Sequence, residues 1–488
     1  MKFFTLIFAF VFAGSLAAQT ELTQAEVQAV IEKAATAVDT PIVVAVTNRR
    51  GDLLALYRRA GAPTTAIGNF SQEQNADEVA AALARTGAFF SNNQAPLSSR
   101  TVRFISGVHF PPGIRYTPNA ALYGIENTNR GCFLSDRYAD GKMLPVSTTI
   151  DGKEPGLGII TGKKDIVDSD PNAVNPGGVP LFKNGVLVGG VGVTGGTPEV
   201  DEFAAFSGAA GAGFGPTPAA PGVVIIAGIH LPFVKQKTLP AGAGPGQLDG
   251  EYRQGPIVSP GPAPEGYLVE PKDGPVGGLS ADEVDQIIQR AVVEGNQIRA
   301  VIRLPIGARA RFVIAVADLD GAIIGFYRMP DATIFSADVA ATKARNVIYF
   351  SSDRLDLSDL PGVPLNTAVT NRTISFGAQP FYSPGIEYTA PGPFFDLYQF
   401  DTAHPCTQGH DAQPNKSGIV FFPGSAPLYR NGVLVGGLGV SGDGVDQDDY
   451  ATAAGAALFP APDTIRADRV QIRRLRLPYW KFPRNPTN

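Results

Sequence analysis

The stretch "HPCTQGHD", residues 404–411, brings together side chains that can bind metals. It contains His404, Cys406, His410 and Asp411. Imidazole, thiolate and carboxylate groups are ligands of transition metals, and a histidine can also be an axial ligand of haem iron. Structural zinc sites usually have four clearly spaced ligands, so the alternative is a solvated loop whose cysteine forms a disulfide. No metal site is assigned from the sequence.

The other two histidines lie in different surroundings. His109 and His230 each stand in an apolar, strand-like segment. We interpret them as core or edge histidines, although either could titrate in a useful range if it lined a pocket.

Two glycine patterns have the spacing of a dinucleotide-binding loop. They run from Gly190 to Gly195 and from Gly437 to Gly442, each after a predicted strand and before a predicted helix. Each preceding strand comes out of a two-residue hairpin, however, and no acidic residue ends the later strand to hold a ribose. The glycines are better explained as positions where a helix packs closely on a strand.

Acidic residues gather at the start of the helix that follows each glycine pattern. They could bind a hard cation, but negative charge at a helix N-terminus is also favoured by the helix dipole, which is the simpler interpretation. They are Glu199, Asp201 and Glu202 in one place and Asp443, Asp446, Asp448 and Asp449 in the other.

Whole blocks of the sequence occur twice in the same order. "PLFKNGVLVGGVGVTGG" begins at residue 180 and "PLYRNGVLVGGLGVSGD" at 427, while "PGIRYT" at 112 is matched by "PGIEYT" at 384. This order indicates a tandem duplication of a large domain. The predicted organisation is a signal peptide over 1–18, a first domain over 19–237, a second over 279–488, and between them an extended, poorly packing Pro/Gly-rich linker over 238–278.

Local signals define the class of each domain. Thr23 with Glu26 and Ser280 with Glu283 are capping boxes that predict an amphipathic helix. The Asn-Gly pairs at 184–185 and 431–432 predict type I′ turns, because both central residues of that turn need positive φ. The expected fold class is α+β, with two tandem repeats that each place helices on an antiparallel sheet.

Composition excludes several functions. The chain has 488 residues, 40 basic and 45 acidic side chains and a formal net charge of −5, so it offers no basic surface for nucleic acid. No segment after the apolar stretch of the signal peptide is long and apolar enough to cross a membrane. We expect a secreted or periplasmic protein. No nucleophile-elbow, H-E-x-x-H or phosphate-loop motif occurs, so enzymatic activity would rest on resemblance alone.

The second repeat resembles a known family. Its segments "FVIAVADLDGAIIGFYRMPDATIFSADVAATKARNVIYF" (312–350) and "PLYRNGVLVGGLGVSGDGVDQDDYATAAGAA" (427–457) are similar to the GlcG/HbpS family of haem-binding or haem-degrading-type domains. The resemblance implies an α+β domain that self-associates and, in some members, binds haem or iron outside the cytoplasm. Members of this family found in glycolate operons have no agreed activity, so the resemblance does not indicate a particular reaction.

Charged positions of this family pattern survive only in the second repeat. Asp318, Asp331 and Lys343 are replaced by Asn48, Gly61 and Leu83 in the first. A family-type ligand site is therefore expected in the second repeat, with the first kept as its docking partner in an intrachain pseudo-dimer; a further homo-oligomer is also open. The candidate ligand-binding residues are His404, His410, Arg328, Lys343, Asp318 and Asp331. Arg328 could face a carboxylate such as a haem propionate, or could be an ordinary surface arginine.

Cys132 and Cys406 are the only cysteines, and they stand at matching places in the two repeats. In an oxidising compartment they are expected to form a disulfide between the repeats. If the repeats pack about a pseudo-two-fold axis, equivalent positions near that axis would meet.

Three functions are compatible with the sequence. The first is an exported haem- or iron-binding protein. The second is a haem-degrading or other small-molecule enzyme, for which catalytic residues are unknown. The third is a non-catalytic extracytoplasmic scaffold or sensor partner.

Overall fold

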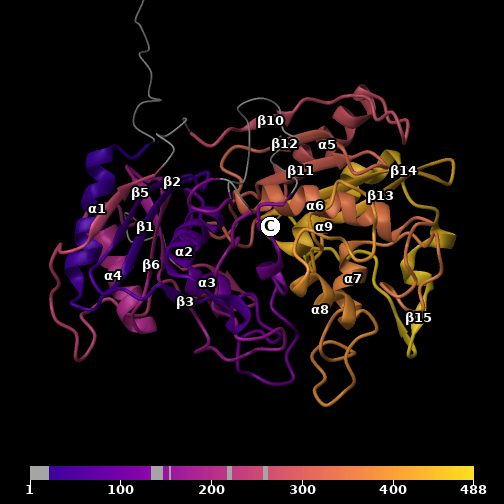
Figure 1. Cartoon of the computed structure of the whole chain (residues 1–488). Helices are drawn as coiled ribbons and strands as arrows, with labels where there is room; N and C mark the ends of the chain where they lie inside the picture. Colours follow the sequence, from indigo (N-terminus) through magenta and orange to yellow (C-terminus); the bar gives the residue numbers. More distant parts are fainter. Residues whose placement is uncertain (1–20, 133–146, 153–154, 217–222, 256–261, 488) are drawn as a thin grey trace, which may run out of the picture.

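The structure is a computed structural model, and it describes residues 21–132, 147–152, 155–216, 223–255 and 262–487. The predicted signal peptide, residues 1–18, lies outside these ranges. In the described residues the chain forms two α+β halves that lie side by side (Figure 1).

Each half is built on a five-stranded antiparallel sheet. The first sheet has the order β5-β6-β1-β2-β9, and the second has β13-β14-β11-β12-β10, which is the same order of equivalent strands. The bounds in the first sheet are β1 Val43–Asn48, β2 Leu53–Arg58, β5 Gly178–Lys183, β6 Val186–Thr194 and β9 Glu251–Gln254. Those in the second are β10 Gly266–Val269, β11 Phe312–Ala317, β12 Ile323–Arg328, β13 Ser425–Arg430 and β14 Val433–Gly442.

Helices cover both faces of each sheet. Two of them pack together on one face, α1 (Gln24–Ala37) with α4 (Pro198–Gly211) and α5 (Ala281–Gly295) with α9 (Val445–Gly455). The opposite face carries α2 (Ala76–Phe90) or α6 (Phe335–Phe350). The remaining elements are α3 Ser99–Phe104, α7 Asn371–Gly377, α8 Phe395–Ala403 and the short hairpins of β3 Thr65–Ile67 with β4 Glu73–Asn75, β7 Ile225–Ile226 with β8 Ile229–His230, and β15 Gln471–Ile472 with β16 Leu475–Arg476.

The local predictions hold in both halves. Thr23 and Ser280 are N-caps with complete capping boxes. Asn184 and Asn431 have φ of 52° and 51° and are followed by glycines of positive φ, as the type I′ turn requires. The duplicated sequence therefore encodes a duplicated α+β fold.

The glycine patterns serve helix packing. A Cβ on Gly190 or Gly192 would overlap the main-chain oxygen of Ala84 or Ala80 on α2. Gly437 and Gly439 meet the main chain of α6 in the same way. This agrees with the close-packing interpretation. The helix in question precedes the strand in sequence, whereas a dinucleotide loop is followed by its helix.

The linker does not behave as expected. Within 238–278, β9 pairs with β2 in the first sheet and β10 pairs with β12 in the second. These residues are extended, as predicted, but they do not stay apart from the domains, because they join the two sheets. Without the linker, β2 and β12 would be edge strands with unpaired backbone groups, and β9 and β10 provide hydrogen-bond partners for those groups.

The pseudo-two-fold arrangement is confirmed only in part. The two equivalent Pro-Gly loops do meet, through reciprocal contacts: the Tyr116 amide donates to the Glu387 carboxylate at 2.7 Å, and the Arg115 guanidinium donates to the Tyr388 hydroxyl at 3.0 Å. The helices meet differently, because Phe90, the last residue of α2, stacks on Phe335, the first residue of α6, with ring centroids 4.2 Å apart. Opposite ends of equivalent helices form this contact.

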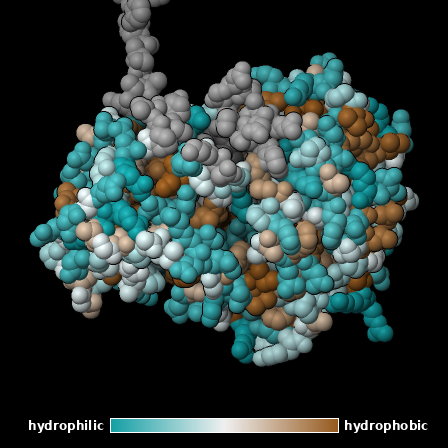
Figure 2. All heavy atoms as spheres, in the orientation of Figure 1, coloured by the Kyte–Doolittle hydropathy of each residue, from teal (hydrophilic) through white to brown (hydrophobic). Residues whose placement is uncertain are grey.

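The surface agrees with the composition. The face shown in Figure 2 is mainly hydrophilic, and its hydrophobic residues lie in separate patches. None of the helices in the described ranges has the length and apolar character of a membrane span.

Gly192→Ala should destabilise the first half, because the new methyl group cannot fit between β6 and α2. We expect a loss of about 2 kcal/mol or more in the free energy of unfolding, measured by urea denaturation followed by circular dichroism. Gly211→Ala is the matched control, since a Cβ there would lie no closer than 3.5 Å to Lys33. Equal stabilities for the two variants would contradict the packing role of Gly192.

Candidate functional site

A pocket of about 410 Å3 lies between the two halves of the chain. The first half contributes Ile105, Leu122 and the segment 225–227, and the second contributes the segments 299–304, 441–442 and 444–448. The aromatic rings of Phe335 and Phe422 complete a largely apolar wall. A cavity of this size and character suits a small organic molecule.

Asp448 lines this pocket and forms a buried ion pair with Lys343 behind it. The Lys343 ammonium lies 3.0 Å from Asp448 Oδ2, donates to the Val440 carbonyl at 2.8 Å and sits over the Phe422 ring. Burial raises the pKa of Asp448 to about 7, although the charge of Lys343 opposes that shift. Burial also lowers the pKa of Lys343. Asp448 therefore has a carboxyl group that can change protonation near neutral pH.

Asp331 lies at the junction between the halves. It pairs with Arg49 of the first half at 2.8 Å and with Arg303 of the second at 2.5 Å. Although burial opposes it, the charges of Arg49 and Arg303 lower the pKa of Asp331. Arg303 itself lines the pocket and also pairs with Asp443 at 2.8 Å, so one guanidinium connects the junction to the pocket wall.

The exposed residues His404 and His410 share a half-buried aromatic neighbour, Phe400. Their rings lie 4.1 and 5.0 Å from the Phe400 ring, centroid to centroid. His404 Nδ1 is 2.9 Å from the Phe400 carbonyl oxygen, and His410 Nδ1 is 2.8 Å from Asp359 Oδ1. Both of these oxygens are acceptors, so the neutral imidazoles carry their proton on Nδ1 and keep the Nε2 lone pair for another ligand.

The remaining candidates have structural partners. Arg328 is buried, and its guanidinium donates to the carbonyls of Ala332 and Pro264, so it is not the surface arginine or propionate ligand that the sequence left open. The Asp318 carboxylate accepts from the amides of Val276 and Gly277 and fixes the turn before α5. Neither lines the pocket.

Other sequence hypotheses concern histidine and cation sites. His109 is buried and faces Glu387 at 3.1 Å across the junction, and His230 is exposed on β8. No group of three or more His, Cys, Asp or Glu suited to a metal ion occurs in the described part of the chain, so the hard-cation alternative is not supported. The acidic residues at the start of α9 instead face Lys343, Arg372 and Arg303.

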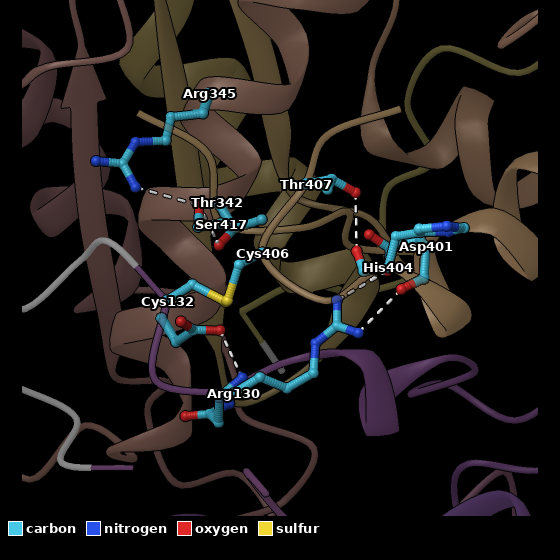
Figure 3. The surroundings of a disulfide bond; sticks show 11 residues. Arg130, Cys132, Thr342, Arg345, Asp401, His404, Cys406, Thr407 and Ser417 are labelled. Carbon is cyan, nitrogen blue, oxygen red and sulfur yellow. Dashed lines mark hydrogen bonds and ion pairs between the residues drawn. A yellow bond between two sulfur atoms is a disulfide. The ribbon is translucent and has the colours of Figure 1, made fainter. Parts of the chain in front are cut away.

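Cys132 and Cys406 form the expected disulfide between the halves. Next to it, Arg130 bonds the Asp401 carboxylate at 3.1 Å and the Asp401 carbonyl at 2.9 Å, as Figure 3 shows. Burial raises the pKa of Asp401 to about 6 against the opposing charge of Arg130. The disulfide leaves Cys406 unavailable as a metal ligand. Together with the contacts between Arg130 and Asp401, it holds the His404 loop against the first half.

Sequence reasoning missed the pocket residues in two ways. Asp448 was one of several acids at a helix start. The signal that could have found it is the replacement of Leu83 in the first repeat by Lys343 in the second, because Lys343 pairs with Asp448. Nothing in the sequence singled out Arg303, because its partners come from segments 28 and 140 residues away.

Comparison with known protein families gives a match in the second half of the chain. Residues 279–457 match the family described as "Haem degrading protein HbpS-like". A corrinoid adenosyltransferase PduO of Salmonella typhimurium is 26% identical over 183 residues, and one of Citrobacter freundii is 28% identical over 185 residues. The matches cover 37% and 38% of this chain and 39% and 40% of those proteins, so the chain spans about two fifths of each relative.

Among solved structures, the crystal structure of a PduOC–haem complex is 24% identical to this chain. The alignment covers 37% of this chain and 93% of that one, with a TM-score of 0.24.

Replacing both cysteines by serine should loosen the junction, because the disulfide closes a separation of 274 residues. We expect a loss of about 2–5 kcal/mol in the stability of the junction, measured by amide hydrogen exchange of residues 129 and 334, whose amides bond across it. The control is Arg130→Lys, which keeps the disulfide and should cost less. Unchanged exchange in the double variant would show that the disulfide does not hold the halves together.

Proposed function

We propose, from the premise that residues 279–457 form a domain of the HbpS-like family, that this protein binds haem outside the cytoplasm. The family description supports the haem-related part of the proposal. The observation that carries it in this chain is the pair of anchored, exposed imidazoles of His404 and His410.

The chemistry of these imidazoles fits an axial ligand of haem iron. A ligating histidine usually donates its second ring N–H to a carbonyl or a carboxylate, which fixes the tautomer and the direction of the ring. Phe400 provides the carbonyl for His404 and Asp359 the carboxylate for His410. Asp359 also accepts from the His410 amide at 3.0 Å, which holds the ring and its backbone together.

The pocket between the halves does not fit the same role. Its walls contain no histidine, cysteine, methionine or tyrosine, so none of its described side chains is a usual axial ligand. We therefore place the haem hypothesis on His404 and His410. When bound, haem would supply a redox-active iron, and the part of this chain would be to hold and orient it.

A haem titration of residues 19–488, followed by Soret absorbance, tests this proposal. We expect a saturable one-site change in the wild type that the His404→Ala/His410→Ala variant loses, since both imidazoles are then absent. His230→Ala, which removes another exposed histidine, is the control and should titrate like the wild type. Absence of a saturable change in the wild type, or its survival in the double variant, would contradict the assignment.

Export is the second part of the proposal. It rests on the basic, apolar and small-residue pattern of residues 1–18 and on the disulfide, which persists in oxidising compartments. Expressed in a Gram-negative host, the full chain should leave the cytoplasm with cleavage after Ala17 or Ala18 and no alkylatable thiol. A variant that lacks residues 2–18 should stay inside with both thiols free. A full-length, uncleaved protein in the cytoplasm would refute export.

A further inference from the structure

The pocket between the halves contains a polar atom without a partner. Asp448 lines the pocket and is only 2% exposed. Its Oδ2 pairs with Lys343, whereas its Oδ1 has no hydrogen-bond partner among the described residues. An unpaired buried oxygen is unfavourable unless a ligand or water satisfies it.

The equivalent carboxylate of the first half, that of Asp201, has a hydrogen-bond partner for its Oδ1. Asp201 is also buried, and burial raises its pKa to about 7. Its Oδ1, however, accepts from the Gly196 amide at 2.9 Å, and Leu83 replaces the lysine. Asp201 does not line the pocket, so the two equivalent, buried carboxyl groups differ in that only Asp448 lies at the pocket wall.

The first turn of α9 forms the wall beside Asp448. Residues 444–447 line the pocket, and the N-cap Gly444 has no side chain to bond the first amides of the helix. The amides of a first helical turn have no partner within the helix and favour an anion.

Positive charge at the rim also remains available. Arg299 lines the pocket and donates to the main-chain oxygens of Arg484 and Asn485, with no carboxylate partner among the described residues. Arg484 lines the pocket beside it. The other charged groups near Asp448 are already paired, Arg303 with Asp443 and Arg372 with Asp446 and Asp449.

We propose that this pocket binds a compact, mainly apolar carboxylic acid as its anion, with protonated Asp448 donating a hydrogen bond to the carboxylate of the ligand. The apolar walls from both halves would enclose the body of the ligand, and the first turn of α9 with Arg299 would favour its charge. The ligand would thereby hold the two halves together at a site independent of His404 and His410.

Because Asp448 must be protonated, the affinity for the anion should fall as the pH rises. The anion needs Asp448 protonated, and that carboxyl group titrates near pH 7. Binding should therefore be strong at pH 6 and weaker by about tenfold at pH 8, since the protonated fraction falls by that factor. Lys343, which pairs with Asp448, favours its ionised form and so lowers the pH at which binding weakens.

The probe is sodium benzoate, titrated calorimetrically into residues 19–488 at pH 6 and pH 8, with benzyl alcohol as the uncharged comparison. We expect one saturable benzoate site with the tenfold pH effect and little binding of the alcohol. Asp448→Asn should bind with the same affinity at both pH values, because an amide donates at either. Asp201→Asn is the matched control and should keep the pH effect.

A second variant covers the case in which Asp448→Asn does not fold. Ala121→Phe adds a ring to the half-buried wall of the pocket and should abolish benzoate binding without changing the circular dichroism spectrum. No saturable benzoate site in the wild type, a retained pH effect in Asp448→Asn, or wild-type binding by Ala121→Phe would each overturn the proposal. Unchanged benzoate binding by the His404/His410 variant would separate this site from the haem hypothesis.

Discussion

The structure depends on the close contact between one helix and one glycine-containing strand in each half. Without a Cβ at Gly190, Gly192, Gly437 and Gly439, α2 and α6 lie directly on the sheet. In the second half this contact brings Lys343 of α6 to the Val440 carbonyl of β14. A side chain at Gly439 would move α6 outward, and the ammonium would lose both that carbonyl and Asp448.

Burial then decides the chemistry of Asp448. Two opposite charges out of water are expensive to desolvate, and a pair is stable only when further hydrogen bonds satisfy both groups. Lys343 has the Val440 carbonyl and the Phe422 ring as additional partners, while Asp448 keeps one free oxygen. The first half reaches a different balance with Leu83 and a main-chain amide. One inherited position therefore gives a buried carboxyl group in each half, but only in the second half does the group line the pocket and keep one oxygen unpaired.

The contact between the halves explains why the two repeats have diverged. Opposite ends of α2 and α6 meet, so each repeat presents a different surface to the junction. Asp331 faces Arg49 and Arg303 there, whereas its counterpart Gly61 is away from those partners and needs no charge. The family-type charge at Asp331 is thus explained by docking, and Asp318 by a turn, which leaves Lys343 as the charged position whose partner, Asp448, lines the pocket.

The sequence by itself determined the duplication, the α+β class, the capping boxes, the hairpin turns and the disulfide partners. These depend on local geometry or on residue identity, which a sequence states directly. It also separated close-packing glycines from a nucleotide loop, because the hairpin before them is a local signal. Only the tertiary structure decided that the linker supplies an edge strand to each sheet, that Arg328 is buried, and that Asp448 has an unpaired buried oxygen. The physical reason is that pairing, burial and desolvation depend on neighbours that lie far apart along the chain, and no local pattern records which of them will meet.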